Sequence, residues 1–304
     1  MSLIHRNVGH QNVISSITFS PDGSQILSGS WDGTAKQWDA RTGELLRTYS
    51  WGSSQINHVA WSPDGATVAV AGDWIEVPLS ESELKSCQAW FDHRDRSFFD
   101  SRTDDDDGPT AETRLFDAAT GELQHRFKNS GDGVAFSPDG KRLAIVSWEQ
   151  LSIIEWPEGR CLAQVKVDYE HTTLRTVLYS EDGEQVACVS DNGVFVFDSQ
   201  TAEPRFAATD SQLFRDSEPI ETGFPVRRLP ESPERIPLYA QPERLAKFWR
   251  ELLPGFRPLA ASDGGMGLPI LAFSPDGRRA AKGVRETGFD VPYKLGFDSG
   301  LTLL

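Results

Sequence analysis

Three residue types that could perform acyl-transfer chemistry stand within one short stretch of the chain: His10, Ser28 and Asp32, followed closely by Trp38. A serine hydroxyl becomes a nucleophile when a histidine removes its proton and a carboxylate orients that histidine. The serine must also be exposed beside an oxyanion hole and a substrate cleft. Whether these side chains can act in this way therefore depends on the elements that carry them.

A second group of candidates is the acidic run from Asp104 to Asp107. It lacks the alternating spacing and the following glutamate of an EF-hand loop, and consecutive like charges are typical of a solvated loop tip. We expect a solvated loop, with a cation site as the alternative. The three cysteines Cys87, Cys161 and Cys188 have no metal-ligand spacing and are expected to be reduced thiols. The sequence also lacks a phosphate-binding glycine loop, so we predict no metal site and no cofactor.

The elements around the first candidates form a regular pattern. Short β-prone runs, separated by Pro-Asp-Gly, Asp-Gly and Thr-Gly, cover Val13 to Phe19, Gln25 to Ser28, Thr34 to Trp38 and Leu45 to Tyr49. These separators supply the fixed or positive φ angles that tight turns need. The stretch predicts one four-stranded antiparallel unit.

The unit repeats along the chain. Its aromatic-Ser-x-Asp-Gly element occurs five times, with the aromatic at Phe19, Trp61, Phe136, Tyr179 and Phe273. The successive intervals are 42, 75, 43 and 94 residues. Two intervals are close to the ~40 to 45 residues of a propeller repeat, and the other two hold extra material.

The opening Gly9-His10 and the closing Trp38-Asp39 make the first unit resemble one blade of the WD-repeat family. This resemblance implies a β-propeller. It also implies that His10, Ser28, Asp32 and Trp38 form the family's structural tetrad, a buried chain of hydrogen bonds within one blade. We therefore predict no catalytic residue. The other blades lack the full set in register, although His125 and His171 lie near two of the equivalent positions.

The predicted fold class is all-β: a WD-repeat-like β-propeller with five clear blades, one degenerate four-stranded blade and a long insertion in blade two. We expect a single domain over residues 1–304, with the insertion at about 75–112. Residues 211–266 hold either the degenerate blade, with Val226 to Leu229 as its first strand and Ile236 to Ala240 as its second, or a short amphipathic helix between Pro242 and Gly255. Either Met1 to Asn7 or Leu301 to Leu304 could supply the outer strand that completes the last blade.

Composition narrows the class of function. The 304-residue chain has a formal net charge of −15 and no basic stripe, so direct binding of nucleic acid is not expected. It contains neither an 18-residue apolar run nor a signal-peptide pattern. We expect a cytoplasmic protein that does not contact a membrane.

Strand alternation places every long connection on one side of the disc. The connections from second to third strands and from each blade to the next share what we call the insertion face, and the short turns share the plain face. Trp31 and Trp148 both lie 12 positions after a first-strand aromatic, on the insertion face. We predict partner contacts there, although the aromatic residues of the insertion could instead form their own small core. The full predicted set is Trp31, Trp74, Trp90, Phe91, Arg94, Phe98, Phe99 and Trp148.

The sequence thus predicts a non-catalytic scaffold that binds a protein partner through the insertion face. One alternative is a ligand-binding or hydrolytic propeller. Another is a structural subunit of a multiprotein complex, with its fifth or sixth blade completed by another chain.

Overall fold

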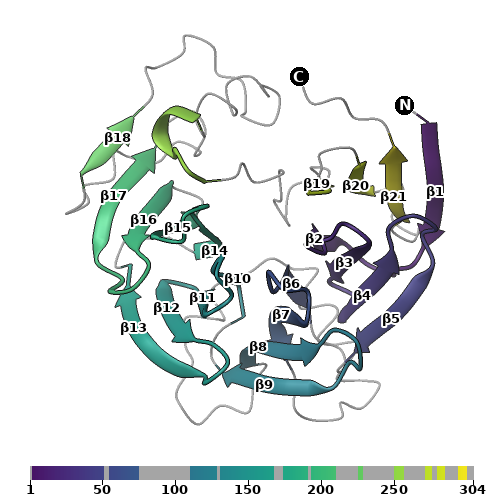
Figure 1. The fold of residues 1–304 in the computed structure, drawn as a ribbon, viewed down its shortest axis with the longest axis horizontal. Coiled ribbons are helices and arrows are strands. Elements are labelled where there is room, and N and C mark those ends of the chain that lie inside the picture. The colour runs from purple at the N-terminus through teal and green to yellow at the C-terminus, as the bar shows by residue number, and fades with distance from the viewer. Residues whose placement is uncertain are drawn as a thin grey trace, which may run out of the picture.

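The computed structural model describes residues 2–50, 55–74, 110–128, 131–167, 174–190, 193–209, 225–228, 250–256, 271–275, 279–284 and 294–299. Most of this described part is β-strand, and the strands form five separate sheets. The sheets follow one another around a common centre (Figure 1). The prediction of a β-propeller is confirmed, and each sheet is one blade.

The strand bounds agree closely with the repeat pattern. Blade one contains β2 (Ile14–Phe19), β3 (Gln25–Ser30), β4 (Thr34–Asp39) and β5 (Leu45–Ser50). Blade two contains β6 (Ile56–Trp61), β7 (Thr67–Trp74), β8 (Thr110–Asp117) and β9 (Leu123–Lys128). Blade three contains β10 (Gly133–Phe136), β11 (Arg142–Ser147), β12 (Gln150–Glu155) and β13 (Arg160–Lys166).

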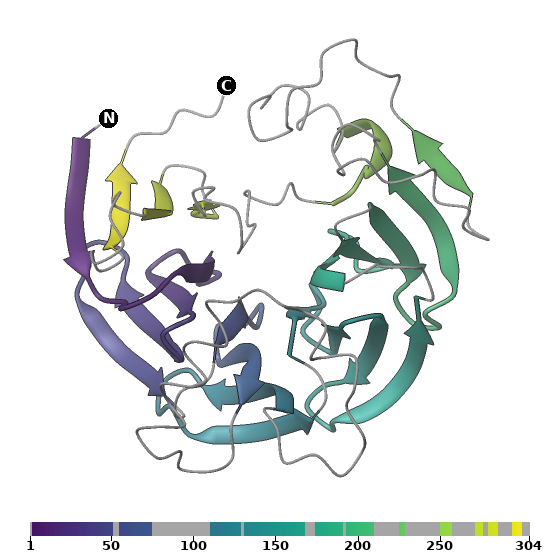
Figure 2. The same cartoon turned by 180° about the vertical axis from the view of Figure 1, so that it is seen from behind.

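The last two blades depart from this simple order. Blade four contains β14 (Leu174–Tyr179), β15 (Gln185–Ser190), β16 (Val194–Asp198) and β17 (Pro204–Thr209), with β18 (Val226–Arg228) as a fifth strand. Blade five contains β19 (Leu271–Phe273), β20 (Arg279–Val284), β21 (Lys294–Ser299) and β1 (Ser2–Val8). The first strands β2, β6, β10, β14 and β19 lie nearest the centre, and β5, β9, β13, β17 and β1 lie toward the rim (Figure 2).

The Ser-x-Asp-Gly elements form their turns through local contacts. In blade one the hydroxyl of Ser20 donates to the Asp22 carboxylate at 2.6 Å, and the N–H of Gln25 donates back to the same hydroxyl at 2.9 Å. Gly23 takes φ 69°, in the region that glycine adopts at no steric cost. The same serine-to-aspartate bond recurs at Ser62, Ser137 and Ser180, so the first and second strands of blades one to four are joined in the same way.

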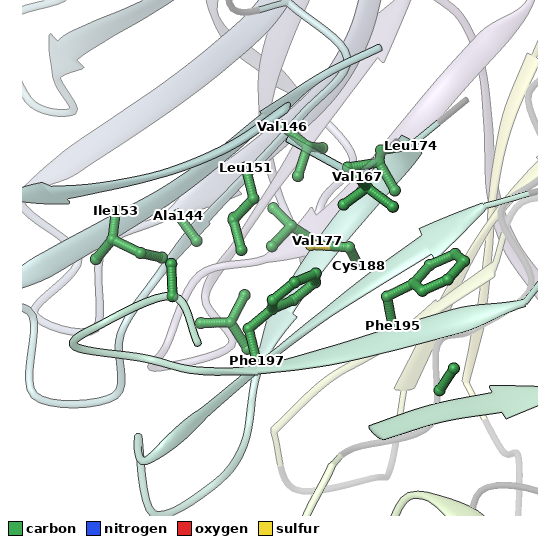
Figure 3. Close-up of a cluster of buried hydrophobic side chains, with 13 residues drawn as sticks. Ala144, Val146, Leu151, Ile153, Val167, Leu174, Val177, Cys188, Phe195 and Phe197 are labelled. Carbon is green, nitrogen blue, oxygen red and sulfur yellow. The ribbon is translucent and has the colours of Figure 1, made fainter. Parts of the chain in front are cut away.

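Apolar side chains from facing sheets fill the space between blades. Between blades three and four, Val146 and Leu151 meet Val177 and Phe195, and all four are fully buried (Figure 3). Fully burying a side chain of this size stabilises the fold by about 1.5–3 kcal/mol. These interfaces fix the relative positions of neighbouring blades.

Long polar side chains also join blades on the plain face. The guanidinium of Arg47 in β5 donates to the carbonyls of Ala119 and Thr120, in the turn between β8 and β9. Arg142 in β11 similarly donates to the Ser199 carbonyl of blade four at 3.1 Å. The short turns are therefore part of the blade interfaces.

The structure settles which terminus completes the last blade. β1 pairs antiparallel with β21, from Ser2 opposite Ser299 to Val8 opposite Lys294. The N-terminal strand thus takes the outer place in blade five, whereas Leu301 to Leu304 lie outside the described residues. The alternative in which another chain completes the fifth blade is wrong.

The predicted end of the insertion is three residues too late. β7 runs on to Trp74, which pairs with Thr110 at the start of β8. The connection therefore spans residues 75–109 rather than 75–112, because an eight-pair ladder between these two strands extends beyond the repeat pattern.

The stretch from 211 to 266 differs from the predicted degenerate blade where it is described. The strand expected at Val226 exists, but β18 pairs in parallel with the outer strand β17 and does not start a new sheet. A helical turn at residues 250–252 precedes Gly255, which has φ 86°. This agrees with the end of the alternative helix. Ile236 to Ala240 lie outside the described residues, as does the remainder of that helix.

Candidate protein-binding face

The four residues of the predicted tetrad form one hydrogen-bonded chain in blade one. The indole Nε1–H of Trp38 donates to the hydroxyl oxygen of Ser28 at 2.9 Å, and that oxygen lies 2.7 Å from His10 Nε2. His10 Nδ1 lies 3.0 Å from Asp32 Oδ2. Because an ionised carboxylate only accepts, Nδ1 carries the proton and Nε2 accepts from Ser28.

The Asp32 carboxylate ends this chain. Burial disfavours its charge, but hydrogen bonds from His10, the Thr34 hydroxyl and the Gln11 N–H outweigh burial and lower its pKa to about 2. The carboxylate is therefore ionised at neutral pH. It ties the segment that enters the blade to the turn between β3 and β4.

The same geometry argues against use of this triad in hydrolysis. Ser28 has no exposed surface and His10 is 1% exposed, so a substrate carbonyl cannot reach the hydroxyl. Ser28 lies nine residues after the first-strand aromatic of blade one. The residues at the same position in blades two, three and four are Val70, Ile145 and Cys188, and all three are buried. The tetrad is a structural link of blade one, and these three blades have apolar packing at that place.

Neither histidine near the other tetrad positions is shown to complete a second tetrad. His125 lies in the outer strand β9, where its ring stacks with Phe127 and meets the Trp156 ring edge-to-face at 5.3 Å. It thus packs against the next blade. His171 lies outside the described residues.

Backbone hydrogen bonds show which connections share the insertion face. The N–H of Trp31, between β3 and β4, donates to the Val13 carbonyl just before β2 at 2.8 Å. The N–H of Leu174, at the entry to blade four, donates to the Trp148 carbonyl at 2.5 Å. Turns between second and third strands therefore lie beside blade entries, as strand alternation predicts.

The predicted partner-binding residues are described only in part. The Trp148 side chain is 46% exposed, Trp31 is partly exposed, and Trp74 is the last residue of β7. Trp148 has φ 52°, which is uncommon for a residue with a side chain. The predicted positions in the insertion lie outside the described residues: Trp90, Phe91, Arg94, Phe98 and Phe99.

The sequence analysis missed a set of polar residues near the centre of the propeller. The register between the first and second strands shifts at Ser15, Asn57 and Arg175. In blade three, Gly133 is paired with Val146, and the N–H of Asp132 also donates to the Val146 carbonyl. β-Bulges of this kind re-aim a side chain. The signal was available, because Ser15, Asn57, Asp132 and Arg175 each lie four positions before a first-strand aromatic.

Three of these side chains act toward the next blade. Ser15 donates to the Ile56 carbonyl and Asn57 donates to the Gly131 carbonyl at 3.1 Å. Asp132 interacts electrostatically with Arg175 at the entry to blade four. The bulges therefore join four consecutive blades near the centre of the propeller.

Asp132 has the most altered acidity in this set. Burial raises its pKa and the negative charge of Asp73 adds to that effect, whereas the N–H of Trp148, the charge of Arg175 and the Ser147 hydroxyl oppose it. The result is a pKa of about 7. The carboxyl consequently keeps its proton to a higher pH than an ordinary aspartate, next to the exposed Trp148 turn.

Other classes of site receive no support from the described part of the chain. Within it, no three His, Cys, Asp or Glu residues are grouped so that they could hold a metal ion. None of the helices described has the length and apolar character needed to span a membrane. Cys161 and Cys188 are free thiols, and Cys87 lies outside the described residues.

Comparison with known proteins identifies the repeat. The family model described as "WD domain, G-beta repeat" matches residues 1–39 and 43–75. Protein groucho of Drosophila melanogaster is 33% identical over 87 residues, covering 29% of this chain and 11% of that protein. The periodic tryptophan protein 2 homolog of Neurospora crassa is 34% identical over 91 residues, covering 28% and 10%. The first 75 residues of this chain therefore contain WD repeats.

The matched ranges show that a WD repeat is offset from a blade by one strand. Residues 1–39 contain β1 of blade five and the first three strands of blade one, and residues 43–75 contain β5 with β6 and β7. A repeat therefore begins with the outer strand of the preceding blade. This offset explains why the first strand of the chain completes the last blade.

The similarity extends over a small part of each relative. Ribosome assembly protein 4 of Chaetomium thermophilum is 43% identical over 44 residues, which is 14% of this chain and 8% of that protein. The chain spans about a tenth of the length of these WD-repeat relatives. Their similarity supports WD repeats in part of this chain and no particular activity.

Proposed function

We propose that this chain is a non-catalytic scaffold that binds a protein partner through its insertion face. The observation that carries the proposal is Trp148, whose indole is 46% exposed while its backbone is bonded to Asp132 and Leu174. Tryptophan is among the residues that dominate binding energy at interfaces, and a backbone that is already fixed loses little entropy on binding. Trp31 lies on the same face.

The other exposed large apolar residues of the described part do not share this position. Leu45, Leu46, Leu123 and Leu162 all lie in the outer strands β5, β9 and β13. Single exposed leucines are ordinary on protein surfaces. Trp148 is distinguished from them by its place on the insertion face and its fixed backbone.

The names of the relatives support a role within a larger assembly. Ribosome assembly protein 4 and the SAGA complex subunit Spt8 of Schizosaccharomyces pombe are named for an assembly process and a complex. We extend this to the present chain as part of the proposal, together with a single domain over residues 1–304 and a cytoplasmic location. The hydrolytic alternative is weakened by the complete burial of Ser28.

The proposal is tested by replacing both tryptophans. In the variant with Trp31→Ala and Trp148→Ala, proteins that co-purify with the tagged wild-type chain should be lost, while the melting temperature changes little. Leu162→Ala is the matched control, because Leu162 is 39% exposed but lies at the rim of the same blade as Trp148. Retention of every partner by the double variant would contradict the proposal.

A further inference from the structure

The turn between β11 and β12 fixes the backbone of Trp148. Ser147 pairs with Gln150, so Trp148 and Glu149 form a two-residue turn in which Trp148 has φ 52°. Glycine is the usual residue at such a position, because a side chain there costs about 1–2 kcal/mol. Two backbone hydrogen bonds of Trp148 stabilise this conformation. Its N–H donates to the Asp132 carboxylate at 2.7 Å, and its carbonyl accepts from the Leu174 N–H.

Carboxyl groups from two blades lie next to this turn. Asp132 contacts the Trp148 backbone, and Asp73, the penultimate residue of β7, is close enough to act on the Asp132 charge. Arg175 offsets one of these charges, and Lys166 pairs with Glu149 at 3.0 Å. The surroundings of the indole therefore carry a net negative charge when Asp132 is ionised.

The charge of the adjoining chain has the same sign. The connection that leaves β7 at Trp74 and returns at Thr110 begins and ends on the insertion face. Residues 75–109 contain ten Asp and Glu against four Lys and Arg, and the whole chain has a formal charge of −15. An acidic partner segment would be repelled from this face and a basic one attracted.

We propose that the insertion face takes a basic segment of a protein partner, with a Lys or Arg side chain lying over the Trp148 indole beside the carboxyls of Asp73 and Asp132. The inference rests on the proposed function and names the chemistry of the partner. A cation within ~6 Å of a ring centroid is attracted by the face of the ring, and tryptophan is the best of the aromatic residues for this contact. The neighbouring carboxylates strengthen the attraction and reject acidic segments.

The experiment measures binding of fluorescently labelled 12-residue peptides by anisotropy at pH 8 and low ionic strength. One peptide contains Lys and Arg among Gly and Ser. Its matched control carries acetyl-lysine and citrulline at the same positions, which keeps length and polarity but removes the charge. The basic peptide should bind, and the control peptide should not.

Trp148→Leu is the decisive variant, because it leaves the net charge unchanged and keeps an apolar side chain. It should weaken binding of the basic peptide roughly three- to thirtyfold. Asp132→Asn should weaken it further when combined with Trp148→Leu, and Leu162→Ala should not change it. A circular-dichroism melt verifies that each variant is folded.

Two outcomes would overturn the inference. One is equal binding of the neutral peptide, and the other is binding that Trp148→Leu leaves unchanged but salt abolishes, which shows bulk attraction to an acidic chain. Failure of the inference is distinguishable from failure of the proposed function. If a partner is lost with Trp31→Ala and Trp148→Ala but is not displaced by the basic peptide, the face is correct and the partner chemistry is wrong.

Discussion

The Asp132 carboxylate accepts a hydrogen bond of 2.7 Å from the backbone N–H of Trp148, in the turn that exposes the indole. The two residues belong to the entry of blade three and to the far end of its second strand. A carboxyl whose pKa is raised to about 7 thus supports the most exposed aromatic side chain of the described insertion face. This hydrogen bond links the protonation of the Asp132 carboxyl to the geometry of the turn that carries Trp148.

Asp132→Asn should make stability less dependent on pH. The folded pKa of about 7 lies above the ordinary value of 3.8, so the folded state binds the proton more tightly. The stability contributed by this proton is fully present below about pH 4 and is lost as pH rises through 7. Asparagine is neutral at all pH values, so the variant should be more stable than the wild type at pH 8, with a free energy of unfolding on the order of 1–3 kcal/mol higher.

Urea denaturation of both proteins at pH 5, 6, 7 and 8 measures this difference. Asp139→Asn is the control with the opposite sign, because hydrogen bonds to the Asp139 carboxylate lower its pKa despite the opposing effect of burial. That variant should be less stable than the wild type by a similar amount at all four pH values, because Asp139 is ionised in both the folded and the unfolded state above about pH 5. A parallel pH dependence for Asp132→Asn and wild type would contradict the prediction.

Ser28→Ala should destabilise the fold although it removes a single oxygen atom. The hydroxyl accepts from Trp38 and donates to His10, so its loss leaves two buried polar groups without this partner. We expect a decrease of about 1–3 kcal/mol in the free energy of unfolding, measured by urea denaturation. Ser24→Ala, in an exposed turn of the same blade, should change it by less than about 0.5 kcal/mol. Equal stability of the two variants would show that the hydrogen bonds of Ser28 to Trp38 and His10 do not stabilise the fold.

The features that the sequence predicts well are those made by residues close together in the chain. The Ser-x-Asp-Gly turns were recognisable because the bond from Ser20 to Asp22 spans two residues. The four tetrad positions were recognisable from their matched spacing, and their hydrogen bonds follow it. By contrast, the acidity of Asp132 depends on Asp73 and Arg175, which belong to the two neighbouring blades.

The same limit explains the error at Val226. Spacing within the repeat predicts the first strand of a degenerate blade at Val226 to Leu229, and β18 is a strand there, but nothing local indicates that it pairs in parallel with β17. The pairing is accompanied by Arg227, whose guanidinium lies 3.6 Å from the centre of the Phe206 ring. Contacts of this kind appear only when the tertiary structure brings distant segments together.

Gly72→Ala should be strongly destabilising because the chain passes very close to this residue. An added Cβ would lie 2.2 Å from the Gln55 carbonyl oxygen and 3.0 Å from the Ile56 Cα, and neither is the end of a flexible side chain. We expect a loss of about 1–3 kcal/mol or more in thermal or urea denaturation. An added Cβ at Gly65 would meet only the Pro21 Cδ, at an ordinary contact distance of 3.8 Å, so Gly65→Ala is opposed mainly by the φ of 73° and should cost about 1 kcal/mol. If Gly65→Ala lost more stability than Gly72→Ala, the close approach of Gln55 to Gly72 would not be what determines the destabilisation.

Leu253→Ala should loosen blade four in particular. Leu252, Leu253 and Phe256 pack against the blade-four face that includes Val196 and Phe206, on the opposite side from blade three. Blades one, two and three have a following blade in that place. Because Leu253 is fully buried, its truncation should cost about 2–5 kcal/mol where unfolding is cooperative.

Hydrogen exchange locates this effect. If the segment at 250–256 protects blade four as the following blade protects the others, amides of β16 and β17 should exchange faster in Leu253→Ala, while those of β3 and β4 stay unchanged. Arg250→Ala is the matched control, because Arg250 is exposed in the same helical turn. Uniform acceleration across all blades would instead show that this contact stabilises the whole propeller cooperatively, and unchanged exchange in β16 and β17 would show that blade four does not depend on it.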